Sequence, residues 1–185
     1  MYIWLIILIA AIAADQATKL LTVAKLDLGS SFDLIHGVFR FTYIRNEGAA
    51  FGMLSEHRWV FLVLSTVAIV GIIIYVIKNP PKSKVAMLSL TLIVAGGIGN
   101  MIDRVRLGYV IDFLDFYAFP FWKWIFNVAD ACVCVGAALM MLWLIAGIVK
   151  DAKAAKNAPA AQSDAGKSES DIAAPENADE SEERK

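Results

Sequence analysis

Two aspartates in apolar surroundings are the residues of this sequence with the clearest capacity for chemistry. Asp112 lies between Ile111 and Phe113, and Asp130 is followed by about nineteen apolar or small residues. Burial disfavours the charged form of a carboxylate, and two carboxylates that face each other cannot both be ionised comfortably. If the fold brings this pair together, we expect it to share one proton near neutral pH.

A shared proton lets two carboxylates divide the work of amide hydrolysis. The ionised member takes a proton from the attacking water, and the protonated member gives one to the carbonyl oxygen. No Ser or Cys stands beside a His in a nucleophile motif. The residues alone leave a structural network or ion passage open, so a small proton-coupled channel or transporter is the alternative function.

Further polar residues interrupt apolar stretches, where ionisable groups are costly and mark functional sites by default. Asp15 and Lys19 are four residues apart and meet on one helical face, where they form either a structural ion pair or part of a site. Asn100, Asp103 and Arg104 share a face of a later stretch and can form one network. Another polar residue, the asparagine at position 127, lies three residues before the second aspartate.

Other candidate motifs carry less chemistry. The glycines at 96, 97 and 99 have no preceding strand and no following Gly-Lys-Ser/Thr, so they indicate close helix packing rather than a phosphate loop. Cys132 and Cys134 are two apart in a helical run, cannot bridge, and are assigned to packing. His36 and His57 lack partners at ligand spacing, so no metal or cofactor is expected. No basic stripe with aromatics indicates nucleic-acid binding.

The elements that position these groups are predicted to be membrane helices. The chain is 58% apolar, with a mean hydropathy of +0.60. Since a bilayer core needs about 20 apolar residues per helix, spans are predicted at 1–23, 59–77, 85–102 and 124–149. The first span also resembles a cleavable signal peptide around residues 11–13, but no Lys or Arg precedes it and apolar residues resume after Lys19.

The orientation follows from the turn at residues 78–84, which has three lysines and no acidic residue. The positive-inside rule places this turn in the cytoplasm, and four spans then place both termini there. The other two connections are also basic, so the orientation depends on this turn alone.

The outer segments and the C-terminal end have their own patterns. Within residues 38–44, Phe39, Phe41 and Tyr43 alternate with more polar neighbours, which predicts a strand in a small antiparallel sheet on the membrane surface. The aromatics of residues 103–123 are interpreted as an interface belt or as substrate contacts. Residues 151–185 hold almost no bulky apolar group, which predicts a disordered cytoplasmic tail after a 1–150 membrane domain.

Five short motifs in order resemble the lipoprotein signal peptidase (signal peptidase II) family. They are DQATK at 15–19, RNEGAAFG at 45–52, GNMIDR at 99–104, GYVIDF at 108–113 and FNVAD at 126–130. Each motif alone is weak evidence for the family, but five of them in this order on a frame of four predicted spans make a specific match. The tail lies outside the match. The resemblance implies an all-α membrane protein with four transmembrane helices, a small extracytoplasmic antiparallel β-sheet (β-cradle) and a short outer helix in the second outer segment.

The resemblance also assigns roles to the residues. It implies that the catalytic dyad is formed by Asp112 and Asp130. The residues that line the site and bind the substrate or the dyad would be Asn46, Asn100, Arg104 and Asn127. The residues that shape the site would be Asp15, Lys19 and Asp103. The implied substrate is a diacylglyceryl-modified prolipoprotein in a bacterial inner membrane, cut just before its lipidated cysteine. Globomycin-type inhibitors, membrane lipid and a monomeric state are expected.

Two positions depart from the family pattern. A Trp-Pro pair is usual shortly before the FN of the last motif, where this chain has Lys123 and Trp124, and Ala131 stands where a serine is common. These changes affect fine positioning rather than the dyad.

A non-catalytic membrane scaffold with a partner-recruiting tail is a third hypothesis, which deletion of residues 151–185 distinguishes from a peptidase.

Overall fold

The computed structural model describes residues 2–48, 58–118, 121 and 124–157. The chain divides into two compact units, residues 1–146 and residues 147–185. The described helices are α1 (Tyr2–Lys25), α2 (Arg58–Lys78), α3 (Lys84–Arg106) and α4 (Val128–Asn157). Apart from the C-terminal end of α4, the described helices and strands belong to the first unit.

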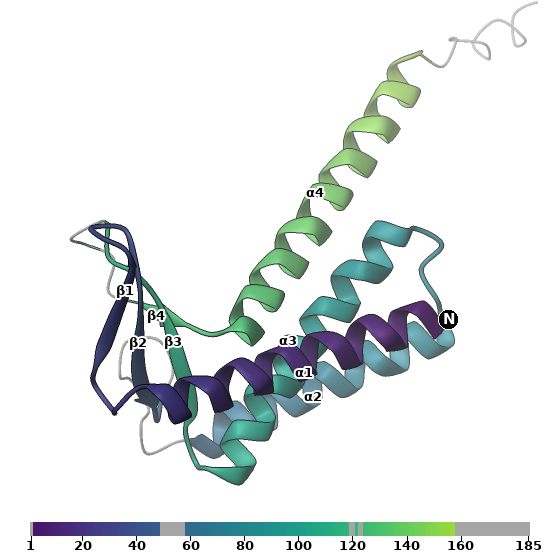
Figure 1. Cartoon of the computed structure of the whole chain (residues 1–185). Helices are drawn as coiled ribbons and strands as arrows, with labels where there is room; N and C mark the ends of the chain where they lie inside the picture. Colours follow the sequence, from purple (N-terminus) through teal and green to yellow (C-terminus); the bar gives the residue numbers. More distant parts are fainter. Residues whose placement is uncertain (1, 49–57, 119–120, 122–123, 158–185) are drawn as a thin grey trace, which may run out of the picture. The chain divides into compact units, whose positions relative to one another are not determined.

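The helices are built for a lipid environment. Among the described residues, α1, α3 and α4 are long and apolar enough to cross a membrane, and α2 contains a shorter apolar stretch at Leu62–Lys78. Large aliphatic side chains such as Leu64 and Val67 are exposed on their outer surfaces, as lipid-facing positions require. Helices α1 and α2 both pack against α3, and the three lie side by side in Figure 1.

A four-stranded antiparallel sheet adjoins the C-terminal end of α1. Its strands are β1 (Ser31–Ile35), β2 (Phe39–Asn46), β3 (Val110–Phe116) and β4 (Ile125–Phe126), in the order β1-β2-β3-β4. Gly37, with a φ of 77°, turns the chain between β1 and β2. The strand predicted around residues 38–44 is confirmed, and the first and second outer segments supply adjacent strands.

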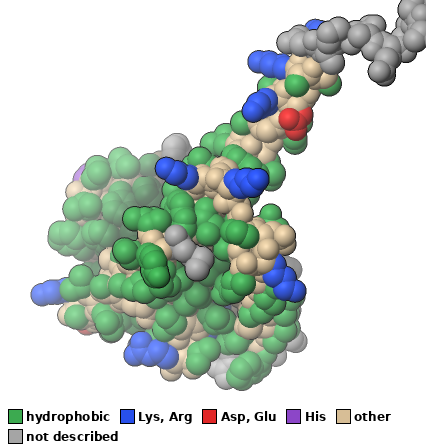
Figure 2. Space-filling model, turned by 90° about the vertical axis from the view of Figure 1, so that its right-hand side faces the viewer, with side chains coloured by type: hydrophobic (Ala, Val, Ile, Leu, Met, Phe, Trp, Pro, Cys, Tyr) green, Lys and Arg blue, Asp and Glu red, His purple; other side chains and the backbone are tan. Residues whose placement is uncertain are grey.

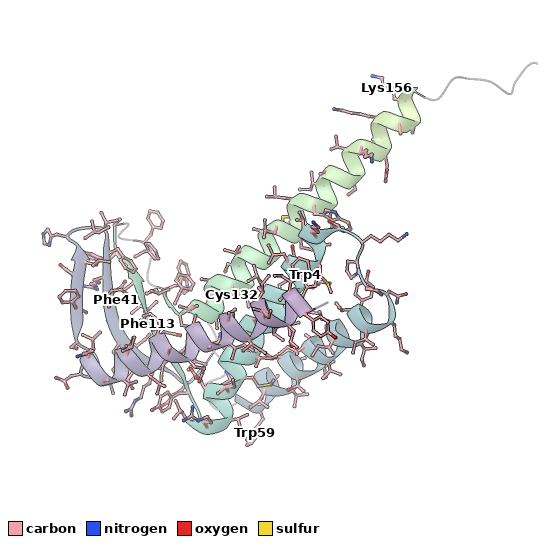
Figure 3. All side chains as sticks on the ribbon, turned by 45° about the vertical axis from the view of Figure 1, so that its right-hand side comes forward. Trp4, Phe41, Trp59, Phe113, Cys132 and Lys156 are labelled. Carbon is pink, nitrogen blue, oxygen red and sulfur yellow. The ribbon has the colours of Figure 1, made fainter. Side chains whose placement is uncertain are left out.

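The sheet has one apolar face that is closed by aromatic side chains. Tyr43, Ile111 and Phe113 are buried together, and Phe41 packs against them. The rings of Phe41 and Phe113 lie 6.2 Å apart between centroids, and Figure 3 shows both on the sheet. Because side chains alternate along a strand, Asp112 projects from the face of β3 opposite to Phe113.

The start of the last helix and the expected short outer helix differ from the sequence prediction. The last helix begins at Val128 rather than at 124, because Ile125 and Phe126 pair with β3 instead of joining the helix. The short outer helix expected in the second outer segment is not found in its described part. There the chain forms β3, whose β-branched and aromatic residues favour a strand.

The end of the chain falls partly outside the described residues. Helix α4 continues to Asn157, which is beyond the predicted end of the fourth span. Residues 158–185, which hold most of the predicted disordered tail, are not among those that the structure describes.

Small residues allow α3, α4 and α1 to approach one another closely. A Cβ on Gly96 would clash with the carbonyl oxygen of Ala129, and one on Gly136 would lie 2.7 Å from the carbonyl oxygen of Ser89. A Cβ on Gly99 would lie 2.6 Å from Asp15 Oδ2. The interpretation of Gly96 and Gly99 as packing residues is confirmed, and the absence of side chains at these positions and at Gly136 brings the polar groups of three helices together.

Candidate active site

The first turn of α4 fixes the position of Asp130. Asn127 lies just before the helix, and its Oδ1 accepts a hydrogen bond from the Asp130 backbone N–H at 2.9 Å. Asp130 Oδ2 accepts in return from the Asn127 backbone N–H at 3.2 Å. This reciprocal pair is a capping box. It places the carboxylate at the positive end of the helix dipole, where negative charge is stabilised.

Strand β3 positions Asp112 beside this helix start. The Asp112 side chain is buried; its Oδ2 accepts from Asn46 Nδ2 at 2.9 Å and its Oδ1 from Asn127 Nδ2 at 2.6 Å. Burial raises the pKa of Asp112 from 3.8 to about 7, and repulsion from Asp130 adds to the rise, while the Asn46 and Asn127 hydrogen bonds oppose it. Asp112 therefore holds a proton for much of the time near neutral pH.

One asparagine joins the two aspartates into a single network. Asn127 donates to the Asp112 carboxyl group from its side-chain Nδ2 and to the Asp130 carboxyl group from its backbone N–H, and its Nδ2 also donates to Asn100 Oδ1 at 3.0 Å. Asn100 Nδ2 in turn donates to Asp130 Oδ1 at 2.7 Å. Asp112 and Asp130, which lie on different elements of the chain, are thus brought to one place by two amides.

A buried ammonium group lies behind this network. Lys19 Nζ is 2.9 Å from Asp15 Oδ2 and 2.9 Å from Asp103 Oδ2, and it donates to Asn100 Oδ1 at 3.0 Å. The side chains of the lysine and both acids are almost entirely buried. A buried charge is tolerated only when it is paired and hydrogen-bonded, and here one cation balances two anions with help from amide groups.

The two acids that pair with Lys19 also hold the backbone next to each candidate catalytic residue. Asp15 Oδ1 accepts from the Ala129 N–H at 2.8 Å, and Asp103 Oδ2 accepts from the Ile111 N–H at 3.2 Å. Ala129 immediately precedes Asp130, and Ile111 immediately precedes Asp112. One ion-paired cluster therefore fixes the backbone on both sides of the site.

Gln16 completes this cluster, and the sequence reasoning did not single it out. Its Nε2 lies 3.1 Å from Asp15 Oδ2, 3.1 Å from Asp103 Oδ1 and 3.2 Å from the carbonyl oxygen of Gly99. The available signal was a second polar side chain inside an apolar helix, directly after Asp15 in the DQATK motif. An amide at this position supplies N–H donors to two carboxylates that share a single lysine.

Arg104 stands apart from the hydrogen-bonded network. In the described part of the chain its guanidinium forms no ion pair or hydrogen bond, so it does not join Asn100 and Asp103 as the i, i+3, i+4 spacing suggested. It is partly buried and lies near the carboxyl groups of Asp130, Asp112 and Asp103. Its donors remain available for a ligand at the site.

Asp115, three residues after Asp112, takes part in a separate interaction. Its Oδ2 accepts from Arg40 Nε at 2.6 Å and from Thr42 Oγ1 at 2.8 Å. This hydrogen bond raises the pKa of Arg40, whose guanidinium also lies over the Tyr117 ring. Asp115 therefore links β2 to β3 and is not part of the site.

The chemistry of this arrangement is acid–base chemistry between two carboxylates. Among residues 2–48, 58–118, 121 and 124–157, no group of three or more His, Cys, Asp or Glu side chains is placed to hold a metal ion. Cys132 and Cys134 are free thiols on α4, and Figure 3 labels the former. A buried carboxyl that carries a proton next to a carboxylate in a helix cap provides one acid and one base.

Comparison with known proteins gives consistent similarities. A family model described as "Signal peptidase (SPase) II" matches residues 7–146. The lipoprotein signal peptidase of Halothermothrix orenii is 43% identical over 139 residues, covering 75% of this chain and 92% of that protein. The lipoprotein signal peptidase of Geobacter metallireducens is 45% identical over 150 residues, covering 77% and 90%.

Solved structures show the same similarity at the level of the fold. A bacterial membrane enzyme determined by the in meso method at 2.3 Å resolution superposes with a TM-score of 0.74 and 30% sequence identity. The match covers 86% of this chain and 94% of that chain. The described helices and sheet thus have the arrangement of a known membrane enzyme.

Proposed function

Because this chain belongs to the signal peptidase II family, we propose that Asp112 and Asp130 are the catalytic dyad with which it hydrolyses its substrate. Membership makes the protein a bacterial membrane aspartic endopeptidase that removes signal peptides from prolipoproteins. The observation that carries the proposal is the joint contact of Asn127 with both carboxylates.

The two aspartates have different surroundings, which suggests different roles. Asp130 accepts hydrogen bonds from a backbone N–H and from Asn100 at a helix N-terminus, and it is only partly buried. We therefore assign Asp130 as the base that takes a proton from water. Asp112, with its pKa raised to about 7 by burial, is the member that gives a proton to the scissile carbonyl oxygen.

The supporting residues have roles that follow from their contacts. Asn46, Asn100 and Asn127 donate to the carboxylates and hold them in place. Arg104, whose guanidinium has no ion pair among the described residues, contacts a backbone carbonyl of the substrate. The cluster at the C-terminal half of α1 shapes the site by fixing the backbone next to each aspartate.

The substrate in this proposal is a prolipoprotein that carries a diacylglyceryl group, cut just before the modified cysteine. We place the protein in the inner membrane as a monomer with four spans and both termini in the cytoplasm. The lysine turn at residues 78–84 joins the ends of α2 and α3 that lie away from Asn100 and Asp103, so a cytoplasmic turn puts the dyad near the outer surface. Globomycin-type inhibitors block cleavage in this proposal.

The test is cleavage of a lipidated prolipoprotein by purified variants. Asp112→Asn and Asp130→Asn each lower the rate by at least about a thousandfold, because each removes one of two proton-transfer groups. Asp33→Asn, on an exposed strand outside the site, is the matched control and keeps the wild-type rate. Near-normal cleavage by either dyad variant contradicts the proposal.

The alternative function, proton-coupled transport, requires polar groups along the whole path through a membrane. Here the buried charged groups gather at one end of α1 and α3, while the other ends are lined by apolar residues. This distribution favours the peptidase. Proton flux in liposomes that depends on Asp130 in the absence of peptide would support transport instead.

A further inference from the structure

A hollow lies among α1, α2 and α3, at the end of these helices that is opposite to Asp112 and Asp130. The hollow, of about 440 Å³, is lined by α1, α2 and α3, with Trp4 and Leu8 on α1 and Val76 and Met87 on α2 and α3. Trp4 lies at the opposite end of α1 from the sheet that carries Phe41 and Phe113 (Figure 3). The hollow is separate from the dyad site, since none of its lining residues forms a hydrogen bond or ion pair with that network in the described part of the chain.

The lining of the hollow is apolar throughout. Apart from Thr91, whose hydroxyl donates to the carbonyl oxygen of Met87 within its own helix, the lining side chains are aliphatic, aromatic, thioether or proline. Its volume lies within the range of about 300–1,000 Å³ that is typical of sites for small ligands. An apolar hollow in a membrane helix bundle suits a hydrocarbon chain and offers nothing to a polar ligand.

Positive charge borders the hollow. Ile77 at the end of α2 and Pro80 in the turn that follows line it. This turn, residues 78–84, carries three exposed lysines, at positions 78, 82 and 84, and no acidic residue. None of the three forms an ion pair within the described residues. Figure 2, which looks onto this end of the helices, shows hydrophobic side chains over much of the surface with Lys and Arg side chains around them.

We propose that this hollow and its lysine turn bind one anionic glycerophospholipid, with an acyl chain against Trp4, Leu8 and Val76 and the phosphate group at Lys78, Lys82 and Lys84. Juxtamembrane lysines attract anionic headgroups, and an adjacent apolar hollow provides the place for a hydrocarbon chain. This commits the site to a membrane lipid of the leaflet opposite to the dyad.

The acidic C-terminal residues of the chain are the other candidate for the lysines. Residues 158–185 are rich in Asp and Glu but contain one isoleucine, Ile172, and no other large aliphatic or aromatic residue. They complement the lysines in charge but cannot fill an apolar hollow. A lipid satisfies both the charge and the apolar lining.

The test uses the fluorescence of Trp4 in the full chain, taken as the difference between the wild type and Trp4→Phe. The protein is placed in phosphatidylcholine nanodiscs that contain a minority of lipid with brominated acyl chains, either phosphatidylglycerol or phosphatidylcholine. Bromine quenches tryptophan at contact distance, so we expect stronger quenching by the anionic lipid at equal mole fraction. Equal quenching by both lipids overturns the proposal.

Charge variants test the headgroup contact. Each lysine near an anionic headgroup strengthens binding of the anionic lipid about fivefold. Changing Lys78, Lys82 and Lys84 to Gln therefore lowers the preference for the anionic lipid at least tenfold. A matched control removes the same number of charges elsewhere, at Lys25, Arg106 and Lys153, and keeps the preference. Retention of the preference in the turn variant contradicts the assignment.

Two further measurements separate this site from other sources of anion binding. Val76→Phe fills the hollow, so we expect it to lower the quenching of Trp4. Unchanged quenching would mean that headgroups adsorb at the surface without an acyl chain in the hollow, and this result overturns the proposal. Added inorganic phosphate leaves the quenching unchanged, because the acyl chain holds the lipid in place. Displacement by phosphate shows a free-anion site and overturns the lipid assignment.

Discussion

Asn127 and Asp130 each satisfy a backbone N–H of the other, at 2.9 and 3.2 Å, so that the candidate base is itself part of a helix cap. The same Asn127 side chain donates to Asp112 at 2.6 Å. Helix stability and the geometry of the dyad therefore depend on one residue, and substitutions at this residue separate the two.

Replacing Asn127 distinguishes its capping role from its donor role. Asn127→Ala loses the cap and both side-chain donations, and it lowers the free energy of unfolding by about 1–2 kcal/mol and the cleavage rate at least about a hundredfold. Asn127→Ser restores an oxygen cap without an N–H donor, so it regains most of the stability but not the rate. Thermal unfolding in detergent and initial cleavage rates measure the two effects. A serine variant with full activity would contradict the donor role.

The rate of cleavage falls as the pH rises above about 7. In the proposed mechanism Asp112 must hold a proton to act as the acid, and burial raises its pKa to about 7. At lower pH the base of the dyad becomes protonated and can no longer take a proton from water, so the profile is bell-shaped. Initial rates with lipidated substrate across the acid to alkaline range provide the measurement. A flat profile argues against a shared proton.

The stability of the fold has a related pH dependence with a definite sign. The pKa of Asp112 is higher in the fold than in the unfolded chain, so the fold binds this proton more tightly. Its stabilisation is complete below about pH 4 and is lost as the pH rises to about 7, by up to about 4 kcal/mol. The free energy of unfolding of the wild type decreases across this range, and Asp112→Asn reduces the slope. An equal slope in both proteins contradicts the raised pKa.

Removing Lys19 leaves two buried carboxylates without their cation. Lys19→Gln lowers the free energy of unfolding by about 3–5 kcal/mol, as expected when one member of a buried ion pair is deleted. Adding Asp103→Asn to this variant removes one of the uncompensated charges and recovers part of the loss. The measurement is a double-mutant cycle of thermal unfolding. Additive losses in the double variant would show that the two groups do not interact.

Asp115→Asn tests whether a buried aspartate close to the dyad in sequence has a catalytic role. Its carboxylate joins Arg40 and Thr42 across β2 and β3, so the variant loses about 1 kcal/mol of stability and keeps its rate within a few-fold. Asp33→Asn is the matched control on β1, where stability is unchanged. A loss of activity as large as that of Asp112→Asn would assign Asp115 to the site.

Deletion of residues 158–185 separates a peptidase from a scaffold that acts through its tail. All residues of the candidate site lie between Asp15 and Asp130, so the truncated protein cleaves its substrate at the wild-type rate. Cleavage assays on the truncated and full chains make the comparison. A large loss of rate would give the C-terminal residues a direct role.

Much of this fold could be predicted because its signals are local. Apolar runs of sufficient length predicted the helices, and alternation around Phe39, Phe41 and Tyr43 predicted a strand that the structure confirms. The start of α4 was placed too early, because Trp124, Ile125 and Phe126 are as apolar as the helix that follows them. Only the pairing of Ile125 and Phe126 with β3, a contact between distant residues, excludes them from the helix.

The candidate site was predictable in its members but not in its connections. Asp15 and Lys19 were expected to pair, and they do. That Asp15 also holds the N–H of Ala129 could not be read from the sequence, because the contact depends on how α1 and α4 pack. Gln16 was missed for the same reason, since an amide has no charge pattern to reveal its partners.

The hydrogen bond from Ala129 to Asp15 has a consequence for biogenesis. A nascent chain exposes its first helix to the bilayer long before the last one leaves the ribosome, and until then Asp15 lacks one of its partners. In the proposed mechanism, the protein can therefore cleave its substrate only after α4 has been inserted into the membrane. A chain that lacks α4 lacks both Asp130 and the backbone N–H of Ala129 that holds Asp15.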